Sequence, residues 1–438
     1  MATAPKLALG MQAPIRAGGL AAVVGAGVSG IAAARLLRAL GARIRLLDRS
    51  PCLPEETLGQ IEETGADLIL GAHLPSHFAG ADLVVASPGV PYSPLLDLLA
   101  QAGAPPLIGE IELALPYVHA PILAFTGTSG KTTTVSLGAA MLEAAGRRVF
   151  LGGNIGAPLC GHVLSPEGAD VLVLELSSFQ LQGIRSLRPA VACILNLTAN
   201  HLDQHRDMEE YRTAKFSIFS GQTEKDLALL PAGLAPEYRK RGFPARLEIV
   251  APTKRFPRTH LIGRHNAANA EAAFLAVRGQ GVGETDAARA VAAFRPLAHR
   301  LENLGEKDGV LYVNDSKSTT VEALRAALES FDAPLLLLAG GRFKGGDLQS
   351  LRPLLRKKAK AVALFGESRE IFTSAFAPAV PLTWDPELPG ALERLGERAR
   401  PGDVILLSPA AASYDLYPNY KERGEHFRRL VQDMEKKS

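Results

Sequence analysis

The sequence predicts an α/β protein with three domains and mainly parallel sheets. Its 438 residues correspond to about three domains at roughly 150 residues each. Short apolar segments alternate with segments of helical periodicity, which is the pattern of strand–helix–strand units. Two apolar segments run into glycine-rich turns that open a helix, and such turns bind phosphate groups. We expect domains over residues 1–108, 109–296 and 297–438.

Composition and charge exclude several classes of protein. With 47% hydrophobic and 21% charged residues, the chain is too apolar for a disordered protein and too charged for a membrane bundle. A formal net charge of +3 is too small to attract nucleic acid over the whole surface, so an anionic ligand must be bound by a local group of basic residues. Cys52, Cys160 and Cys193 lack the CxxC spacing of a zinc or redox site. We expect a cytoplasmic protein that binds no nucleic acid and inserts into no membrane.

The first domain is predicted from a strand, a glycine turn and a helix. An apolar strand at residues 20–24 leads into the turn Gly-Ala-Gly-Val-Ser-Gly at residues 25–30, and a helix runs from Ile31 towards Gly41. The next strand ends at Asp48, where a Rossmann-like domain places the acceptor for a ribose hydroxyl. This context predicts a nucleotide or dinucleotide site, and a glycine turn that serves packing alone is the alternative. Further strands are expected at residues 68–70 and 83–86, the second leading into Ser87-Pro88-Gly89.

The central domain carries the strongest motif. Residues 122–125 form an apolar strand, and Thr-Gly-Thr-Ser-Gly-Lys-Thr-Thr follows at residues 126–133 before a predicted helix. This is a shortened P-loop, because Phe125 stands where the usual pattern has another glycine. Its backbone amides would cradle a polyphosphate, with Lys131 on the β- and γ-phosphates and the Thr132 hydroxyl on Mg²⁺. We therefore expect ATP binding; a surface lysine at a helix start is the alternative.

Polar residues follow two further strands of the central domain, at residues 171–174 and 191–195, and predict the rim of an active site. Glu175 and His201 come from these two segments and could hold a second Mg²⁺ near the P-loop, although each is equally compatible with a structural role. Lys215 lies on a predicted helix, where a lysine is normally a surface residue.

The third domain is predicted to be a second Rossmann-like α/β domain. A helix is expected at residues 321–329. Before this domain, within the expected central domain, the basic stretch at residues 239–258 is expected to be a solvated loop. The strands are expected at residues 310–313, 334–339, 361–365 and 404–407.

Further motifs follow in order along the chain. They are GGNIG from Gly152, ELSSFQL from Glu175, NLTANHLD from Asn196, HNAANA from His265, AHR ending at Arg300, NDSKST from Asn314, GGRFKGGD from Gly340 and SPAAASYD from Ser408. Together with TGTSGKTT they resemble the Mur ligases, from the first glycine turn to nearly the last helix. ELSSFQL, GGNIG and the SPAAAS ending are most similar to the branch that adds D-glutamate.

The resemblance implies an ATP-dependent carboxylate–amine ligase of cytoplasmic peptidoglycan precursor synthesis. The carboxylate of UDP-N-acetylmuramoyl-L-alanine would be phosphorylated by ATP, and the amine of D-glutamate would displace the phosphate through a tetrahedral intermediate. Two Mg²⁺ ions would neutralise the moving charge, and the enzyme would act as a monomer. A related Mur ligase that adds L-glutamate or L-alanine is one alternative. A NAD-dependent oxidoreductase, supported by the glycine turn alone, is another, but it would have no use for a P-loop.

The resemblance also implies roles for individual residues. The catalytic set would be Lys131, Glu175, His201, Lys215 and Lys317. ATP would be held by Gly127, Thr128, Ser129, Gly130, Lys131, Thr132, Thr133, Asn266, Asn269, Arg300 and Asp315. The metal ligands would be Thr132, Glu175, His201 and a carbamylated Lys215. The UDP-linked substrate would be held by Gly25, Gly27, Val28, Ser29, Gly30, Asp48, Ser87, Gly89, Asn154, Ser177 and Gln180. The added glutamate would be held by Lys317, Thr319, Lys344, Ser413 and Tyr420.

Some positions depart from the family pattern. Arg49-Ser50 replaces a Thr-Arg order near the expected uracil site, Thr320 stands where asparagine is common, and Ala411 stands where cysteine is common. None of them belongs to the expected ATP or metal set. They bear on the uridine contacts and on fine specificity.

Overall fold

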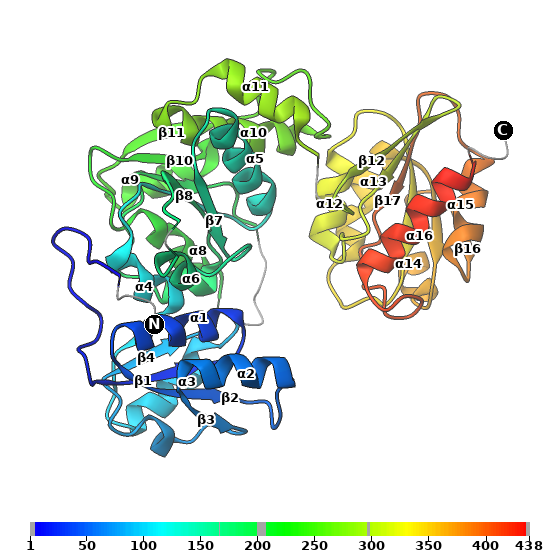
Figure 1. Cartoon of the computed structure of the whole chain (residues 1–438). Coiled ribbons are helices and arrows are strands. Elements are labelled where there is room, and N and C mark those ends of the chain that lie inside the picture. Colours follow the sequence, from blue (N-terminus) through cyan, green and yellow to red (C-terminus); the bar gives the residue numbers. More distant parts are fainter. Residues whose placement is uncertain (1–4, 166, 199–206, 296–297, 435–438) are drawn as a thin grey trace. The chain divides into compact units, whose positions relative to one another are not determined.

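The computed structural model of the chain describes residues 5–165, 167–198, 207–295 and 298–434 (Figure 1). The chain divides into two compact units, the first formed by residues 1–251 with 269–290 and the second by residues 252–268 with 291–438. Two sheets lie in the first unit and one lies in the second. The predicted α/β fold with three domains is confirmed. Its boundaries stay predictions, since residue 108 falls within a strand and residue 296 lies outside the described residues.

The first sheet has the parallel strand order β3-β2-β1-β4-β5. From β1 the chain moves to β2 and β3 on one side, and it returns to β4 on the other. The carboxyl ends of β1 and β4 therefore form the crevice where such sheets bind ligands. The elements are β1 (Leu20–Val24), α1 (Val28–Ala39), β2 (Arg43–Asp48), α2 (Glu55–Thr64), β3 (Asp67–Leu70), η1 (Pro75–Phe78), β4 (Leu83–Ala86), α3 (Tyr92–Gln101), β5 (Leu107–Gly109), α4 (Glu110–Ala114) and η2 (Leu115–Tyr117).

Helix α1 begins earlier than the sequence suggested. Gly27 has an extended backbone, with φ −75° and ψ −177°, and it is the N-cap of a helix that starts at Val28. The predicted start at Ile31 is wrong, because Ser29 and Gly30 already form part of the first helical turn. The glycine turn is thereby shortened to residues 25–27.

The second sheet is parallel throughout, in the order β11-β10-β9-β6-β8-β7. The elements up to α8 are β6 (Ile122–Thr126), α5 (Lys131–Ala144), β7 (Val149–Gly153), α6 (Leu159–Val163), β8 (Val171–Glu175), α7 (Ser178–Gln182), β9 (Val191–Ile194) and α8 (Met208–Phe216). The rest are η3 (Ser217–Phe219), β10 (Leu227–Pro231), η4 (Ala232–Leu234), α9 (Ala235–Lys240), β11 (Arg246–Val250), α10 (Arg264–Val277), η5 (Arg278–Gln280) and α11 (Glu284–Ala293).

The basic stretch at residues 239–258 is not simply a solvated loop, as the sequence suggested. Strand β11 lies within it and pairs with β10 in parallel at the edge of the second sheet. The charged residues Arg246 and Glu248, exposed and half-buried respectively, hide the strand pattern, because an edge strand needs few buried side chains. Tyr238 of α9 is buried and donates a hydrogen bond to Ala245 O over 2.9 Å, which fixes the helix on the strand.

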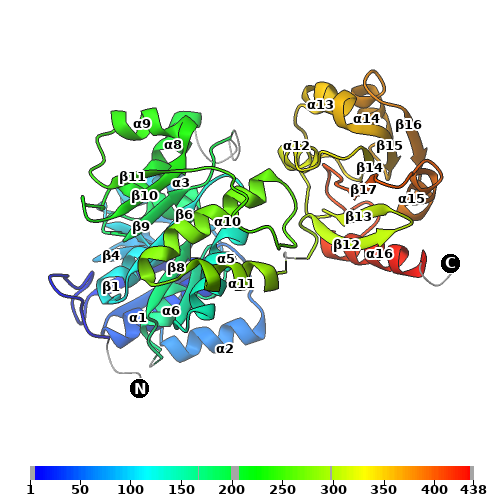
Figure 2. The same ribbon diagram turned by 90° about the horizontal axis from the view of Figure 1, so that it is seen from above.

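The third sheet has the order β12-β13-β17-β14-β15-β16, and β12 alone in this sheet is antiparallel to its neighbour. Figure 2 shows α16 and α13 on opposite faces of it. The elements are β12 (Glu302–Lys307), β13 (Val310–Asn314), α12 (Val321–Glu329), β14 (Leu335–Gly340), η6 (Leu348–Leu351), α13 (Arg352–Lys358), β15 (Ala359–Phe365), α14 (Arg369–Phe376), β16 (Leu382–Asp385), α15 (Leu388–Gly396), β17 (Val404–Leu407) and α16 (Tyr420–Asp433).

Hydrophobic cores cover both faces of the sheets. In β14, Leu335 and Leu337 pack in one cluster and Leu336 and Leu338 pack in another, so consecutive leucines are buried on opposite faces. In the first unit, one cluster runs from α1 through α4 and α6 to the second sheet. This shared core explains why the first two sheets form one unit.

Candidate active site

The glycine turn after β1 is held by short side chains from neighbouring strands. Gly25 has φ +98°, and a Cβ on Gly30 would collide with the Gly25 carbonyl oxygen. Ser87, after β4, donates its hydroxyl to the same oxygen over 3.1 Å. Asp48 accepts the amide of Ala26 over 2.7 Å. The structure therefore brings together the predicted residues at the ends of β1, β2 and β4.

Asp48 is also a structural residue. Its second oxygen accepts the amide of Ser50 over 2.9 Å. Burial raises the pKa of this carboxyl, but the hydrogen bonds from Ala26 and Ser50 outweigh that effect and the net pKa lies below its usual value. Arg49 and His73 join Asp48 in lining a cavity of about 640 Å³, counted with the solvent at its mouth. Gly25 and Gly89 also line it, whereas on the first turn of α1 Val28 is exposed and Ser29 is half-buried.

The P-loop forms between β6 and α5 as the motif predicted. Gly130 has φ +80° and is the N-cap of α5, whose first turn contains Lys131, Thr132 and Thr133. The Lys131 ammonium donates to the carbonyls of Gly127 and Thr128, over 2.9 and 3.2 Å. The lysine therefore lies over the loop that would receive phosphate.

Two side chains that sequence analysis did not single out hold this loop, and the predicted Asn269 lies against it. Asn196, after β9, accepts the amide of Ser129 over 2.9 Å and donates to its carbonyl over 3.1 Å. Tyr211 of α8 lies 3.0 Å from the Thr128 hydroxyl. Tyr211 precedes Lys215 by one helical turn and shares its face of the helix, which is the signal that could have found it. Asn269 of α10 lies directly against Gly130.

Lys215 is buried, with 2% of its surface exposed, and is not the surface residue that helix position alone suggests. Its ammonium donates to the Thr126 hydroxyl and to Gly127 O, each over 3.1 Å. Burial first, and then the charge of Lys131, lower the pKa of Lys215 from 10.5 to about 7, against an opposing effect of Glu175. A large fraction of this lysine is therefore a neutral amine near pH 7.

Glu175 ends β8 and is 2% exposed. Its Oε1 accepts the side-chain amide of Asn154 over 2.8 Å, and its carbonyl accepts the Asn154 backbone amide over 2.8 Å. Gly153 brings the two chains this close, because its φ is +98° and a Cβ would collide with the Glu175 carbonyl. Within the described part of the chain, Oε2 of Glu175 is buried and has no hydrogen-bond partner.

An unpaired buried carboxylate oxygen is the kind of group that a divalent cation binds. The buried amine of Lys215 and the hydroxyl of Thr132 belong to the same edge of the sheet, so these residues fit the expected cation. His201 lies outside the described residues. Over the described ranges, no group of three or more His, Cys, Asp or Glu side chains forms a metal site by itself. The metal role of these residues stays a prediction.

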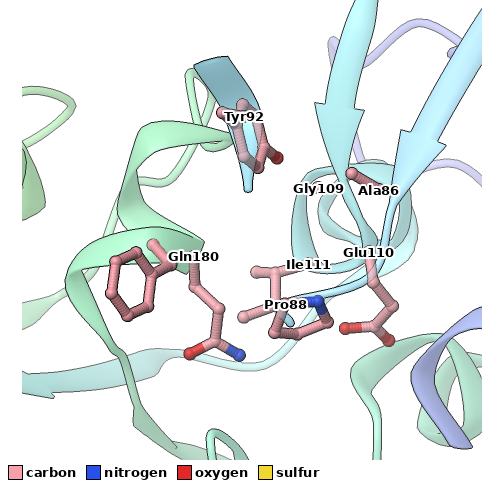
Figure 3. Close-up of a pocket in the computed structure, with 8 residues that line it drawn as sticks. Ala86, Pro88, Tyr92, Gly109, Glu110, Ile111 and Gln180 are labelled. Atoms are coloured by element: carbon pink, nitrogen blue, oxygen red, sulfur yellow. The ribbon is translucent and has the colours of Figure 1, made fainter. Parts of the chain in front are cut away.

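Ser177 and Gln180 form a capping box at the start of α7. Ser177 donates its amide and hydroxyl to Gln180 Oε1, over 2.9 and 3.1 Å. The side-chain oxygen of Gln180 is thereby fixed, while its Nε2 is buried and finds no partner among the described residues. Gln180 lines a small cavity together with Pro88, Tyr92 and Glu110 (Figure 3).

The remaining predicted nucleotide residues belong to the second unit. Asp315 accepts the amide of Leu301 over 3.2 Å and the hydroxyl of Ser408 over 3.0 Å. Burial raises its pKa from 3.8 to about 7, and hydrogen bonds and the charge of Arg300 act in the opposite direction. Within the described ranges Nε of Arg300 is buried without a partner. Asn266 donates to Ile262 O over 2.8 Å.

The predicted glutamate site consists of loops after β13, β14 and β17, which are neighbours in the third sheet. The Lys317 ammonium lies 5.3 Å from the ring centroid of Tyr420, and that of Lys344 lies 5.3 Å from the ring of Tyr414. Ser413 is buried. Thr319 is half-buried just before α12.

Arg423 of α16 is the residue that joins these loops, and sequence analysis missed it. It is fully buried and donates to Ser316 O over 2.8 Å and to Ala411 O over 3.0 Å. Thr320 caps α12 by accepting the amide of Ala323 over 3.3 Å, so this departure from the family pattern keeps a helix cap.

Family models match all three parts of the chain. A Mur ligase MurD-like N-terminal domain matches residues 20–107, a Mur ligase middle domain matches residues 125–242, and a Mur ligase glutamate ligase domain matches residues 299–411.

Curated relatives match over nearly the whole chain. A UDP-N-acetylmuramoylalanine–D-glutamate ligase of Oleidesulfovibrio alaskensis is 55% identical over 424 residues, covering 96% of this chain and 95% of the relative. A protein of the same name from Nitratidesulfovibrio vulgaris is 53% identical, covering 96% and 98%. A MurF ligase structure from Thermotoga maritima in complex with ADP shares the fold, with a TM-score of 0.58, 18% identity and 96% of each chain covered. The chain belongs to the Mur ligase family and is an ATP-dependent ligase that forms an amide bond.

Proposed function

We propose that this ligase adds D-glutamate to UDP-N-acetylmuramoyl-L-alanine and releases ADP and phosphate. The observation that carries the proposal is the cluster of Lys131, Lys215 and Glu175 at the carboxyl edge of the second sheet, with one carboxylate oxygen left unpaired among the described residues. The substrates are taken from the names of relatives that are more than half identical to this chain. The unbroken P-loop geometry favours a ligase over an oxidoreductase.

The chemistry begins with an unreactive carboxylate. Its negative charge repels an amine and its leaving group would be oxide, so transfer of the ATP γ-phosphoryl group to the carboxylate removes both obstacles. Lys131 is already directed over the loop and would exchange its bonds to Gly127 and Thr128 for bonds to phosphate oxygens. The loop amides and the positive end of α5 would stabilise the same charge.

Mg²⁺ would be held by Thr132, Glu175, His201 and a carbamate on Lys215, and when bound it would neutralise the negative charge of the phosphate groups. The carbamate forms when the neutral amine attacks carbon dioxide, which makes one N–C bond and releases one proton. A pKa of about 7 supplies that amine near neutral pH. Lys215 would thus change from a cation to an oxygen ligand.

Domain roles follow from these placements. Residues 1–108 would bind the UDP-linked substrate, residues 109–296 would bind ATP and residues 297–438 would bind the amino acid. Lys317 and Lys344 would pair with the two carboxylates of glutamate. No helix in the described ranges has the length and apolarity needed to cross a bilayer. We place the reaction in the cytoplasm and expect a monomer.

The deciding experiment measures phosphate release from ATP and UDP-N-acetylmuramoyl-L-alanine, with D-glutamate, L-glutamate and L-alanine supplied separately. We expect phosphate release with D-glutamate and with neither of the other two amino acids. Release with L-alanine or L-glutamate instead would favour a different Mur ligase, and no amino-acid-dependent release with any of them would overturn the ligase proposal.

The carbamate is tested separately. Active enzyme exposed to ¹³C-labelled carbon dioxide should show a carbamate signal that is absent from the Lys215→Arg variant. If wild-type and variant proteins give the same spectrum, Lys215 is not a carbamylated metal ligand.

A further inference from the structure

Helix α4 follows the last strand of the first sheet and carries two carboxylates that the reaction does not use. Glu110 is its first residue and is 3% exposed, and Glu112 lies two positions later. Both side chains accept backbone amides from segments that connect strands of the second sheet, namely α6 and the turn after α7. Figure 3 shows Glu110 beside the cavity that Gln180 also lines.

Glu110 caps a helix that belongs to another part of the chain. Its Oε1 accepts the Cys160 amide over 2.6 Å, and the Leu159 amide bonds to the same carboxylate. These amides begin α6, and a helix provides no internal partner for amides in its first turn. The N-cap of α6 is Pro158, which offers no side-chain acceptor. Glu110 is therefore the acceptor that the local sequence lacks.

The loop that enters α6 is the one that carries Asn154. Residues 154–158 connect β7 to α6, and Asn154 donates to Glu175 Oε1 over 2.8 Å. The position of α6 thus determines where this loop ends, and the loop determines how Glu175 is held.

Glu112 makes the matching connection to the other substrate loop. Its carboxylate accepts the amides of Arg185 over 2.8 Å and Ser186 over 3.0 Å, just after α7 with its Ser177–Gln180 capping box. Gly109 adds a backbone bond to Gly183 O over 3.0 Å. One short helix therefore contacts both segments through two acidic side chains, two positions apart.

We propose that Glu110 and Glu112 are positioning residues, which tie α4 to the loop that carries Asn154 and to the end of α7, the helix that carries Gln180. Through the Asn154 loop, Glu110 holds Glu175 in the geometry of the reaction. The inference rests on the proposed function for its meaning, but the contacts themselves can be tested without any substrate. A purely structural role would change stability alone. A positioning role also changes how the folded enzyme uses Mg²⁺.

Hydrogen exchange of the full-length protein tests the contacts. Glu110→Ala should accelerate exchange at residues 154–163 by at least about tenfold while leaving residues 183–187 unchanged, and Glu112→Ala should do the reverse, because each removes a different acceptor. Glu110→Gln keeps an acceptor oxygen at the same reach and should exchange within about threefold of wild type. In Glu110→Asp the side chain is one methylene shorter, so the acceptor lies farther from the amides and hydrogen exchange should be faster than in Glu110→Gln. This pair of variants keeps the test usable if the alanine variant does not fold.

Cys160→Ala is the matched control. It removes the 3.2 Å contact from Sγ to the Glu110 carbonyl in the same buried place but keeps the Cys160 amide and its bond to the carboxylate. Equal exchange in Glu110→Ala and wild type would overturn the proposal. As an ordinary core variant, Cys160→Ala should accelerate hydrogen exchange evenly over the first unit. If Glu110→Ala shows that same even acceleration, the proposal is also overturned.

The kinetic readout uses the folded variants. Glu110→Ala should lower kcat at least about tenfold and raise the Mg²⁺ concentration for half-maximal rate, with the KM for D-glutamate unchanged, and Glu110→Gln should restore both values. A lower melting temperature with wild-type kcat and Mg²⁺ dependence would make Glu110 merely structural. Absence of turnover in the wild-type protein would refute the proposed function and leave the exchange result standing.

Discussion

Lys215 makes the sharpest prediction, because a buried cation reduces stability in a way that depends on pH. Replacing it by methionine keeps an unbranched side chain, one atom shorter, and removes the charge. The difference between a pKa of 10.5 and one of about 7 corresponds to about 5 kcal/mol at 1.36 kcal/mol per pH unit. Two hydrogen bonds of about 1 kcal/mol each are lost, although Thr126 still bonds to Leu176 O and Gly127 still accepts from Lys131. Lys215→Met should therefore raise the free energy of unfolding by about 3 kcal/mol at pH 7, while abolishing turnover.

The direction of the pH dependence follows from where the proton is bound. Below pH 7 the lysine is protonated in the folded and unfolded chains, so the full penalty is present. Between pH 7 and 10.5 the unfolded chain keeps the proton that the folded chain has lost, and the penalty falls by about 1.4 kcal/mol per pH unit. The difference in free energy of unfolding between Lys215→Met and wild type should accordingly be close to zero at pH 9.

Urea unfolding in carbon-dioxide-free buffer measures this difference. Far-ultraviolet circular dichroism follows the whole chain, whereas the fluorescence of Trp384, the single tryptophan, follows the second unit and should not respond. Lys225→Met, at an exposed position, is the control and should leave both transitions unchanged. If Lys215→Met unfolds at the same or lower urea concentration than wild type at pH 7, or if the gap stays constant up to pH 9, the reasoning from burial is wrong.

Three further predictions concern other parts of the chain. Gly30→Ala should lower the free energy of unfolding by about 1–3 kcal/mol and weaken binding of the UDP-linked substrate, because its Cβ meets a carbonyl oxygen; circular dichroism and substrate titration measure both effects. Tyr414→Leu should raise the KM for D-glutamate about two- to fivefold by releasing Lys344, and Tyr414→Phe should stay near wild type. In the second unit, Asp315 holds its proton up to about pH 7 when folded but only to about pH 4 when unfolded, so this carboxyl makes stability fall by about 1.4 kcal/mol per pH unit as pH rises between those values. Asp315→Asn should lack that slope in tryptophan-monitored urea titrations.

The sequence predicted most interior strands because they are buried on both faces. It missed β10, an interior strand of the second sheet, although four of its five residues are buried. Residues 335–338 are four consecutive leucines, and the strand at residues 171–174 is equally apolar. The strands that went unpredicted include β7, β11, β12 and β16, which are the edges of the second and third sheets. Edge strands lack one neighbour, and most residues of these four are exposed or half-buried, so their sequences resemble loops. Polar composition alone could not separate the two.

The P-loop could be predicted from its motif, since its conformation depends on local glycines and a helix start. The state of Lys215 could not, because a lysine on a short helix carries no local sign of burial. Its surroundings come from Thr126 and Gly127, which lie almost ninety positions earlier in the chain. The same limit applies to Glu110, whose partners begin a helix in another part of the unit.

The backbone contacts at Gly30 and Gly153 restrict how this protein can change by mutation. At either position a side chain of any kind would collide with a carbonyl oxygen of the main chain, and no rotamer relieves such an overlap. The main chain around these positions therefore offers small molecules a surface that mutation cannot readily change. An inhibitor that hydrogen-bonds to the main chain there, rather than to exchangeable side chains such as Arg49, should select for resistance less often.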